Sequence, residues 1–154
     1  MDITKIYLGS DHGGFLLKQG LYAFLTEKGY PIEDCGVFSE ASAHYPDIAI
    51  SVCKKVLKEA SSIGILICGT GIGMSITANK IPGIRAALCS EPVSAKMSRA
   101  HNNANVLCLG GRMIGYLMAC SIVEFFLYTP FDEGRHSHRL SLIQELEKES
   151  KHES

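Results

Sequence analysis

Short β-rich runs alternate along the chain with longer stretches whose apolar positions repeat at helical spacing. The run IGILIC at 63–68 is apolar throughout, as expected for a strand that is buried on both faces of a parallel sheet. In the segment 14–28, the side chains of Leu17, Leu21, Phe24 and Leu25 fall on one side of a helix. We therefore predict strands at 3–9, 31–35, 63–68, 84–89 and 106–109, and helices at 14–28, 48–57, 74–80, 92–100, 114–127 and 135–148.

Five strands that alternate with helices predict right-handed crossovers and an all-parallel sheet. The expected fold is an α/β three-layer sandwich of Rossmann-like type, with helices on both faces of a five-stranded sheet and a further C-terminal helix. The length of 154 residues fits one domain over 1–154, and the polar end at 147–154 is expected to fray. Ligands bind at the carboxyl edge of such sheets, so the loops after strands one, three, four and five should share one rim.

Charge and composition exclude several classes of function. Fifteen basic and sixteen acidic residues give a net charge of −1, which offers no general field for nucleic acid or an anionic membrane. The chain has no secretory signal and no apolar run of membrane-spanning length. Its six cysteines contain no CxxC pair, so we expect reduced thiols and a cytoplasmic protein. We expect neither a metal nor a cofactor, because no HExxH or Cys/His pairing occurs and His136 and His138 would lie on different faces of a helix.

Two glycine-rich loops follow predicted strands. In the first, Asp11 alone is equally well explained as a helix cap, whereas His12 should lie at the rim, where the two side chains could bind ligand hydroxyls. The second, CGTGIG at 68–73, has neither the Walker A ending nor the dinucleotide fingerprint. Its glycines leave main-chain N–H groups free to bind an anion at a helix N-terminus, where the thiolate of Cys68 should be favoured. A buried structural cysteine is the alternative; beside Thr70 and three glycines we prefer the functional interpretation.

Further candidates lie in the second half of the chain. His101 and Asn102 stand at a predicted helix end, where they fit a C-cap, and a histidine at the rim would also serve as a proton shuttle. Arg112 follows the fifth strand, and Arg135 and Arg139 are four residues apart on one predicted helix face. Guanidinium groups bind phosphate oxygens, so the three arginines could form a phosphate clamp. An ordinary solvated helix face is the alternative for Arg135 and Arg139.

Sequence blocks along nearly the whole chain carry a family resemblance. They are SDHGGF, YPD, ICGTGIGMSITANK, PGIRAALCSEPVSAKMSRAHNNANVLCLGGR and GRHSHR. These blocks resemble the ribose-5-phosphate isomerase B family, which includes galactose-6-phosphate and allose-6-phosphate isomerases. The resemblance implies an aldose–ketose isomerase of the pentose phosphate pathway that acts on ribose 5-phosphate through an enediolate, with allose 6-phosphate or galactose 6-phosphate as alternative substrates. It also implies a homodimer, or a homotetramer built from dimers, with the active site at the subunit interface.

The resemblance also implies a role for each candidate. Cys68 is the base that acts at carbon 2, and His101 of the neighbouring subunit opens the sugar ring with help from Asp11 and His12. Asn102 contacts the substrate. The enediolate is stabilised by Thr70 and by the main-chain amides of Gly69, Thr70, Gly71, Ile72 and Gly73. The phosphate-binding positions are Arg112, Arg135 and Arg139.

Two positions qualify the resemblance, and other classes of function stay open. A second branch of the family uses a glutamate where Met74 stands here, so Cys68 is the base that is implied. His44 stands where an acidic residue is common, which leaves the fit of the substrate open. The main alternative from a different class is a non-catalytic nucleotide- or flavin-binding module, which a bound chromophore would reveal. A redox protein is disfavoured because no second cysteine is near Cys68 in sequence, and a pseudo-enzyme subunit because the candidate set is intact.

Overall fold

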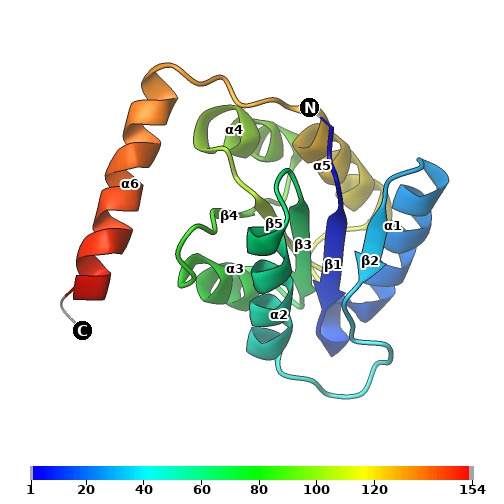
Figure 1. Cartoon of the computed structure of the whole chain (residues 1–154). Helices are drawn as coiled ribbons and strands as arrows, with labels where there is room; N and C mark the ends of the chain where they lie inside the picture. Colours follow the sequence, from blue (N-terminus) through cyan, green and yellow to red (C-terminus); the bar gives the residue numbers. More distant parts are fainter. Residues whose placement is uncertain (1, 153–154) are drawn as a thin grey trace.

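A five-stranded parallel sheet lies at the centre of the computed structural model, which describes residues 2–152 (Figure 1). Its strands are β1 (Ile6–Ser10), β2 (Ile32–Asp34), β3 (Ile63–Cys68), β4 (Ala86–Leu88) and β5 (Val106–Gly110). They are arranged in the order β2-β1-β3-β5-β4, and each neighbouring pair is parallel. The predicted α/β fold is confirmed.

Helices cover both faces of the sheet and bury two separate apolar clusters. On one face lie α1 (Phe15–Glu27), α4 (Pro92–Asn102) and α5 (Tyr116–Tyr128), and on the other α2 (Tyr45–Lys58) and α3 (Ile72–Asn79). Alternate side chains of β3 pack into the two clusters: Ile65 and Ile67 lie in the first, and Leu66 lies in the second. Among residues 2–152, no helix combines the length and the apolar composition needed to cross a bilayer.

The predicted bounds hold best where the chain is buried on both sides. The third strand lies at the predicted residues, whereas α2 begins at Tyr45, three residues before the prediction, because Pro46 suits the first turn of a helix. The fourth strand is shorter than the predicted 84–89. Its first part is a turn, in which the N–H of Ile84 donates to the carbonyl of Ile81.

The C-terminal helix α6 (Arg135–His152) stands outside both layers, at the β4 edge of the molecule (Figure 1). The prediction that 147–154 fray is wrong for the described part, because α6 runs to His152. Both carboxylate oxygens of Glu147 accept the N–H of Gly83 at 3.2 Å, which fixes the far end of the helix. Between α6 and the β4 edge lies an open cavity of about 810 Å³, lined on the helix side by Leu140, Ile143 and Leu146.

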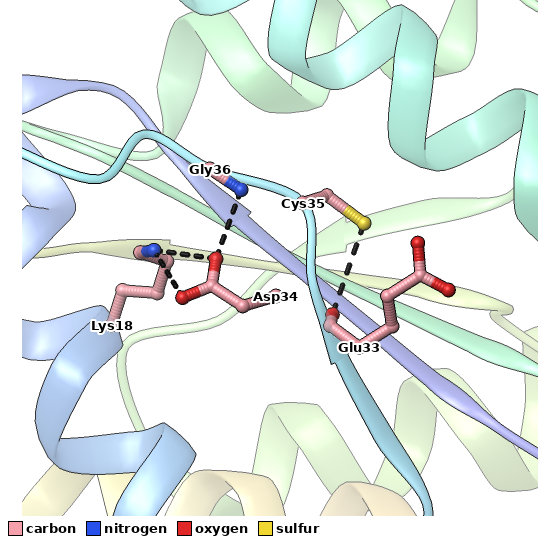
Figure 2. A network of polar contacts seen from close by, with 5 residues as sticks. All are labelled: Lys18, Glu33, Asp34, Cys35 and Gly36. Carbon is pink, nitrogen blue, oxygen red and sulfur yellow. Dashed lines mark hydrogen bonds and ion pairs between the residues drawn. The ribbon is translucent and has the colours of Figure 1, made fainter.

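A partly buried ion pair fixes the loop that follows β2 (Figure 2). Lys18 of α1 is 1% exposed, and its Nζ lies 2.5 and 2.7 Å from the two carboxylate oxygens of Asp34. The same carboxylate accepts the N–H of Gly36 at 2.9 Å. Main-chain bonds then join this loop to the end of β1: the N–H of Ser10 donates to the carbonyl of Gly36, and the N–H of Val37 to that of Ser10. The first glycine-rich loop begins directly after Ser10, so the ion pair helps to position it.

Removing the buried amine should destabilise the protein far more than removing an exposed one on the same helix. Lys18→Met leaves the carboxylate of Asp34, which is 27% exposed, without its charged partner and should lower the free energy of unfolding by about 2 kcal/mol. Lys28 offers a matched control, because it pairs with Glu124 at 2.7 Å and also lies over a phenylalanine ring, but is 35% exposed. Lys28→Met should change the free energy of unfolding much less, because an exposed ion pair contributes little. Urea unfolding at one protein concentration measures the free energy of unfolding of both variants. Equal losses of stability would contradict the structural role given to Lys18.

Candidate active site

Cys68 ends the central strand β3 beside a turn that only glycine can form. Its side chain is 5% exposed, and the N–H of Gly71 donates to its Sγ at 3.1 Å. The φ of Gly71 is +78°, and a Cβ there would lie 2.5 Å from a methyl group of Leu88 and 2.8 Å from the carbonyl carbon of Leu109. A side chain at this position would therefore push the amide away from the sulfur. Because α3 begins at Ile72, the sulfur also lies at a helix N-terminus, where a negative charge is stabilised.

Three loops pack backbone against backbone around this cysteine. A Cβ on Gly13 would lie 3.0 Å from the nitrogen of Gly69, and one on Gly111 would lie 2.7 Å from the carbonyl oxygen of Gly13. The N–H of Gly111 donates to the carbonyl of Cys68 at 2.8 Å, and that of Arg112 to the carbonyl of Gly69 at 3.0 Å. The loops after β1, β3 and β5 thus share one rim, as predicted, and Leu88 at the end of β4 reaches Gly71.

The side chains of the first loop have structural partners as well as access to the rim. Asp11 is buried, and its Oδ1 accepts the N–H of Gly13 at 2.9 Å, so the capping interpretation is confirmed. The Nδ1 of His12 accepts the N–H of Ala43 at 3.2 Å. This bond leaves the Nε2 of a neutral ring to carry the proton, and it attaches the segment before α2 to the site. The rim therefore includes the start of α2.

Some amides of the CGTGIG loop are already engaged within the chain. The Gly71 N–H is directed at Cys68, and the Ile72 N–H donates to the hydroxyl of Thr70 at 3.2 Å. The exposed side chain of Thr70 therefore stands at the mouth of the loop, held by the first turn of α3. The side chain of Arg112 is exposed and passes beside Gly69, where a Cβ would meet its Nη1 at 3.5 Å.

Tyr45 is a site residue that the sequence analysis did not single out. A Cβ on Gly73 would lie 2.6 Å from its ring, so the ring lies directly on the glycine-rich loop. It is the first residue of α2, and part of it is exposed. An aromatic residue before Pro-Asp at a predicted helix start was the available signal. His44, the N-cap residue before it, is exposed and makes no side-chain capping bond.

The remaining candidates lie at the opposite end of the sheet. His101 and Asn102 form the last turn of α4, and the chain just after them meets the start of β3, where the N–H of Gly64 donates to Asn105. Cys68 is at the other end of that six-residue strand, four residues and therefore roughly 13 Å beyond Gly64 at ~3.3 Å per residue. Within one chain, His101 therefore does not lie at the rim with Cys68.

His101 belongs instead to a group formed with the start of α6. Its ring stacks on that of His136 with the centroids 4.3 Å apart, and its Nε2 lies 4.0 Å from a carboxylate oxygen of Asp132. Arg135 and Arg139 are exposed in the first turns of the same helix. Burial, and then electrostatic repulsion from neighbouring basic groups that include Arg135 and Arg139, lower the pKa of His136 and so favour its neutral ring.

The structure thus divides the predicted residues into two groups. The first, at the carboxyl edge of the sheet, comprises Asp11, His12, Cys68, Gly69, Thr70, Gly71, Ile72, Gly73 and Arg112. The second, at the amino edge, comprises His101, Asn102, Arg135 and Arg139. The first group can hold a thiolate and an oxyanion, and the second offers an acid–base group and two cations. One copy of the chain does not bring them together.

Comparisons with known proteins agree over almost the whole chain. The sequence model of the family described as Ribose/Galactose Isomerase matches residues 6–143. Ribose-5-phosphate isomerase B from Escherichia coli (strain K12) is 45% identical over 145 residues, which cover 94% of this chain and 97% of that protein. The namesake from Mycolicibacterium paratuberculosis is 40% identical over 146 residues, with 94% and 92% covered.

Solved structures of the same name superpose closely. Ribose-5-phosphate isomerase B from Clostridium thermocellum matches with a TM-score of 0.93 and 46% identity, over 96% of this chain and 99% of that one. The Mycoplasma genitalium enzyme, solved with bound ribulose 5-phosphate, matches with a TM-score of 0.90 and 39% identity, over 94% and 97%.

The geometry predicts that Cys68 reacts first among the six thiols. Burial raises the pKa of the other five, to about 12 for Cys53 and about 11 for Cys35 and Cys89, and upward for Cys108 and Cys120. Cys68 alone among the described cysteines has an α-helix N-terminus and a main-chain N–H directed at its sulfur. Brief treatment with iodoacetamide at pH 7.5, followed by peptide mass spectrometry, should label Cys68 before the more exposed Cys35. Faster labelling of Cys35 would contradict this ranking.

Proposed function

The chain belongs to the ribose/galactose isomerase family, and from this premise we propose that it is an aldose–ketose isomerase that interconverts ribose 5-phosphate and ribulose 5-phosphate. A proton leaves carbon 2 of the open-chain aldose and returns to carbon 1 of an enediolate, while another moves from O2 to O1. The observation that carries the proposal is the Cys68 sulfur held against the Gly71 amide. It occurs in a chain whose near full-length relatives are named ribose-5-phosphate isomerase B.

Cys68 is the proposed base. The Gly71 N–H and the start of α3 stabilise its thiolate, so the sulfur can accept the carbon-bound proton and hold it between the two carbons. Negative charge then develops on the sugar oxygens. We assign the stabilisation of that charge to the hydroxyl of Thr70 and to the loop amides that are not engaged within the chain, those of Gly69, Thr70 and Gly73, at roughly 3 kcal/mol for each well-aligned donor.

The sugar enters as a closed ring, so a second acid–base group is required. We assign ring opening to His101, assisted by Asp11 and His12 from the rim that holds Cys68. Since His101 lies at the other end of its own sheet, it serves the site of a second subunit. Each site then combines the Cys68 group of one subunit with the partner's His101 and Asn102. The same docking adds the partner's Arg135 and Arg139 to Arg112 as the phosphate clamp.

Exposed apolar side chains support a dimer, alone or as half of a tetramer. Two lie within or directly beside the Cys68 group: Ile72 is 51% exposed, and Met113, which follows Arg112, is 68% exposed. Others lie along α6, among them Leu142 and Leu146. Apolar patches next to a divided site are typical of an interface in a homo-oligomer.

The domain and the compartment follow the same premise. We propose one isomerase domain over 1–154 that acts in the cytoplasm, where the six free cysteines stay reduced. A nucleotide- or flavin-binding module is disfavoured because the Gly71 amide of the glycine-rich loop donates to the sulfur of Cys68 and is therefore not free to bind a phosphate group.

Replacing the base should abolish turnover and spare binding. Cys68→Ala should lower kcat for ribose 5-phosphate by about 10²–10⁴-fold, while the affinity measured by calorimetry stays within a few-fold. Cys35→Ala, which removes a thiol outside the site, is the control and should keep wild-type kcat. Ribose, allose and galactose phosphates are compared in one coupled assay. Full turnover by Cys68→Ala would remove this residue from the mechanism.

A divided site predicts complementation between two inactive variants. In a mixed dimer of Cys68→Ala and His101→Asn, one site carries both substitutions and the other carries neither. Equimolar subunits that reassort at random should therefore recover about a quarter of wild-type activity in a twofold-symmetric dimer. The assay uses the closed-ring substrate after co-refolding. Mixing Cys68→Ala with Cys68→Ser is the control and should recover nothing. Failure of the first pair to recover activity, with mixed dimers demonstrated by mass spectrometry, would contradict a shared site.

A further inference from the structure

His101, Asp132 and His136 bring three metal-ligating side chains together where α4 ends and α6 begins. One donor atom from each lies within 4.8 Å of the other two. These residues come from three segments that no sequence motif joins. We propose that they form a binding site for a divalent transition-metal ion of the Zn²⁺ class, and that the bound ion inhibits the enzyme by occupying His101. The binding is independent of the proposed function, whereas the inhibition rests on it.

The donor set selects the class of ion. Two imidazole nitrogens and one carboxylate oxygen are a ligand combination that Zn²⁺ uses with a fourth position open to water. Mg²⁺ and Ca²⁺ prefer all-oxygen sites, so they should bind poorly here. Co²⁺, Ni²⁺ and Cu²⁺ suit imidazole ligands and should share the site.

The backbone that carries the three ligands is held in place. His101 lies in the last turn of α4. The N–H of Asp132 donates to the carbonyl of Ala100 at 2.9 Å, which fixes the linker against that turn. The N–H of His136 donates to the carbonyl of Glu133 at 3.1 Å, and its ring is buried against the ring of His101. The approach of the three side chains is therefore determined by main-chain contacts.

The ligands are close to one another but not yet in a coordinating geometry. The two imidazole planes differ by only 10°, so their lone pairs run side by side instead of converging. Zinc–nitrogen bonds of about 2.0–2.1 Å require the donors to move closer together. The side chains of His101 and Asp132 are 41% and 55% exposed and have room to turn. Arg135 and Arg139 add positive charge nearby, so we expect weaker binding than at a structural zinc site.

Occupation of the site would act directly on catalysis. A ring nitrogen that coordinates a metal ion cannot exchange a proton with the sugar, so ring opening by His101 would stop. In the proposed dimer, the ion would also stand beside the partner's phosphate-binding surface. A competing possibility is that added metal binds the thiolate of Cys68, and the test must separate the two sites.

The binding test titrates Zn²⁺ into the metal-stripped full-length protein and follows the heat of binding. It is carried out in the Cys68→Ser background, so that this thiolate is not a ligand. One ion per chain is expected, and His136→Asn or Asp132→Asn should weaken binding by roughly 10–100-fold. His138→Asn, on the same helix but outside the three proposed ligands, is the matched control and should bind Zn²⁺ as the parent protein does. Asp132 is exposed, so its variant should fold even if His136→Asn does not.

The activity test uses the chain with Cys68 intact. Micromolar Zn²⁺ should inhibit isomerisation of ribose 5-phosphate, a chelator should restore it, and Asp132→Asn should be several-fold less sensitive. Unchanged binding in both Asp132→Asn and His136→Asn, or binding that vanishes with Cys68→Ser alone, would overturn the site. Binding that depends on the three proposed ligands without any inhibition would support the site and overturn the inhibition, even if Cys68→Ala confirms the isomerase.

Discussion

The candidate site depends on close main-chain contact between three loops at the carboxyl edge of the sheet. Gly13, Gly69 and Gly111 bring these backbones within van der Waals contact, and Gly71 aims its N–H at the sulfur of Cys68. A Cβ at Gly13, Gly71 or Gly111 would meet main-chain atoms at 3.0 Å or less. The reactive environment of the thiol is thus a property of the backbone, and side chains such as Thr70 and Arg112 are added at its margin.

Strand order explains why these loops meet. The chain places β2 on one side of β1 and β3 on the other, so the direction of winding reverses between β1 and β3. At such a reversal the two following loops lead to opposite faces of the sheet and leave room for a ligand. The loop with Asp11 and the loop after Cys68 flank this position. The Lys18–Asp34 ion pair stabilises the loop after β1, because it fixes the segment at Gly36 that is hydrogen-bonded to Ser10.

Much of this could be predicted from the sequence, and the failures have physical causes. The strand at 63–68 was predicted to the residue because both its faces are buried, and the rim of glycine-rich loops follows from parallel topology. The residues alone left open whether His101 reaches this rim, and in its own chain it does not, because a crossover helix runs opposite to the strands and its last turn lies at the amino edge. The order of α6 up to His152 depends on a bond between Glu147 and Gly83, 64 residues apart, which no local pattern reveals. The contact of Tyr45 with Gly73 was hidden for the same reason.

The position of α6 affects how the protein tolerates mutation. This helix contacts its own chain through the His101–His136 stack, through the buried side chain of Leu140 and through Glu147, and an open cavity lies beside it. Surface changes along its middle should therefore leave the fold of the subunit almost untouched. In the proposed dimer their effect would fall on the angle at which two copies dock, so changes in this helix could alter assembly while the sheet and the loops around Cys68 stay constant.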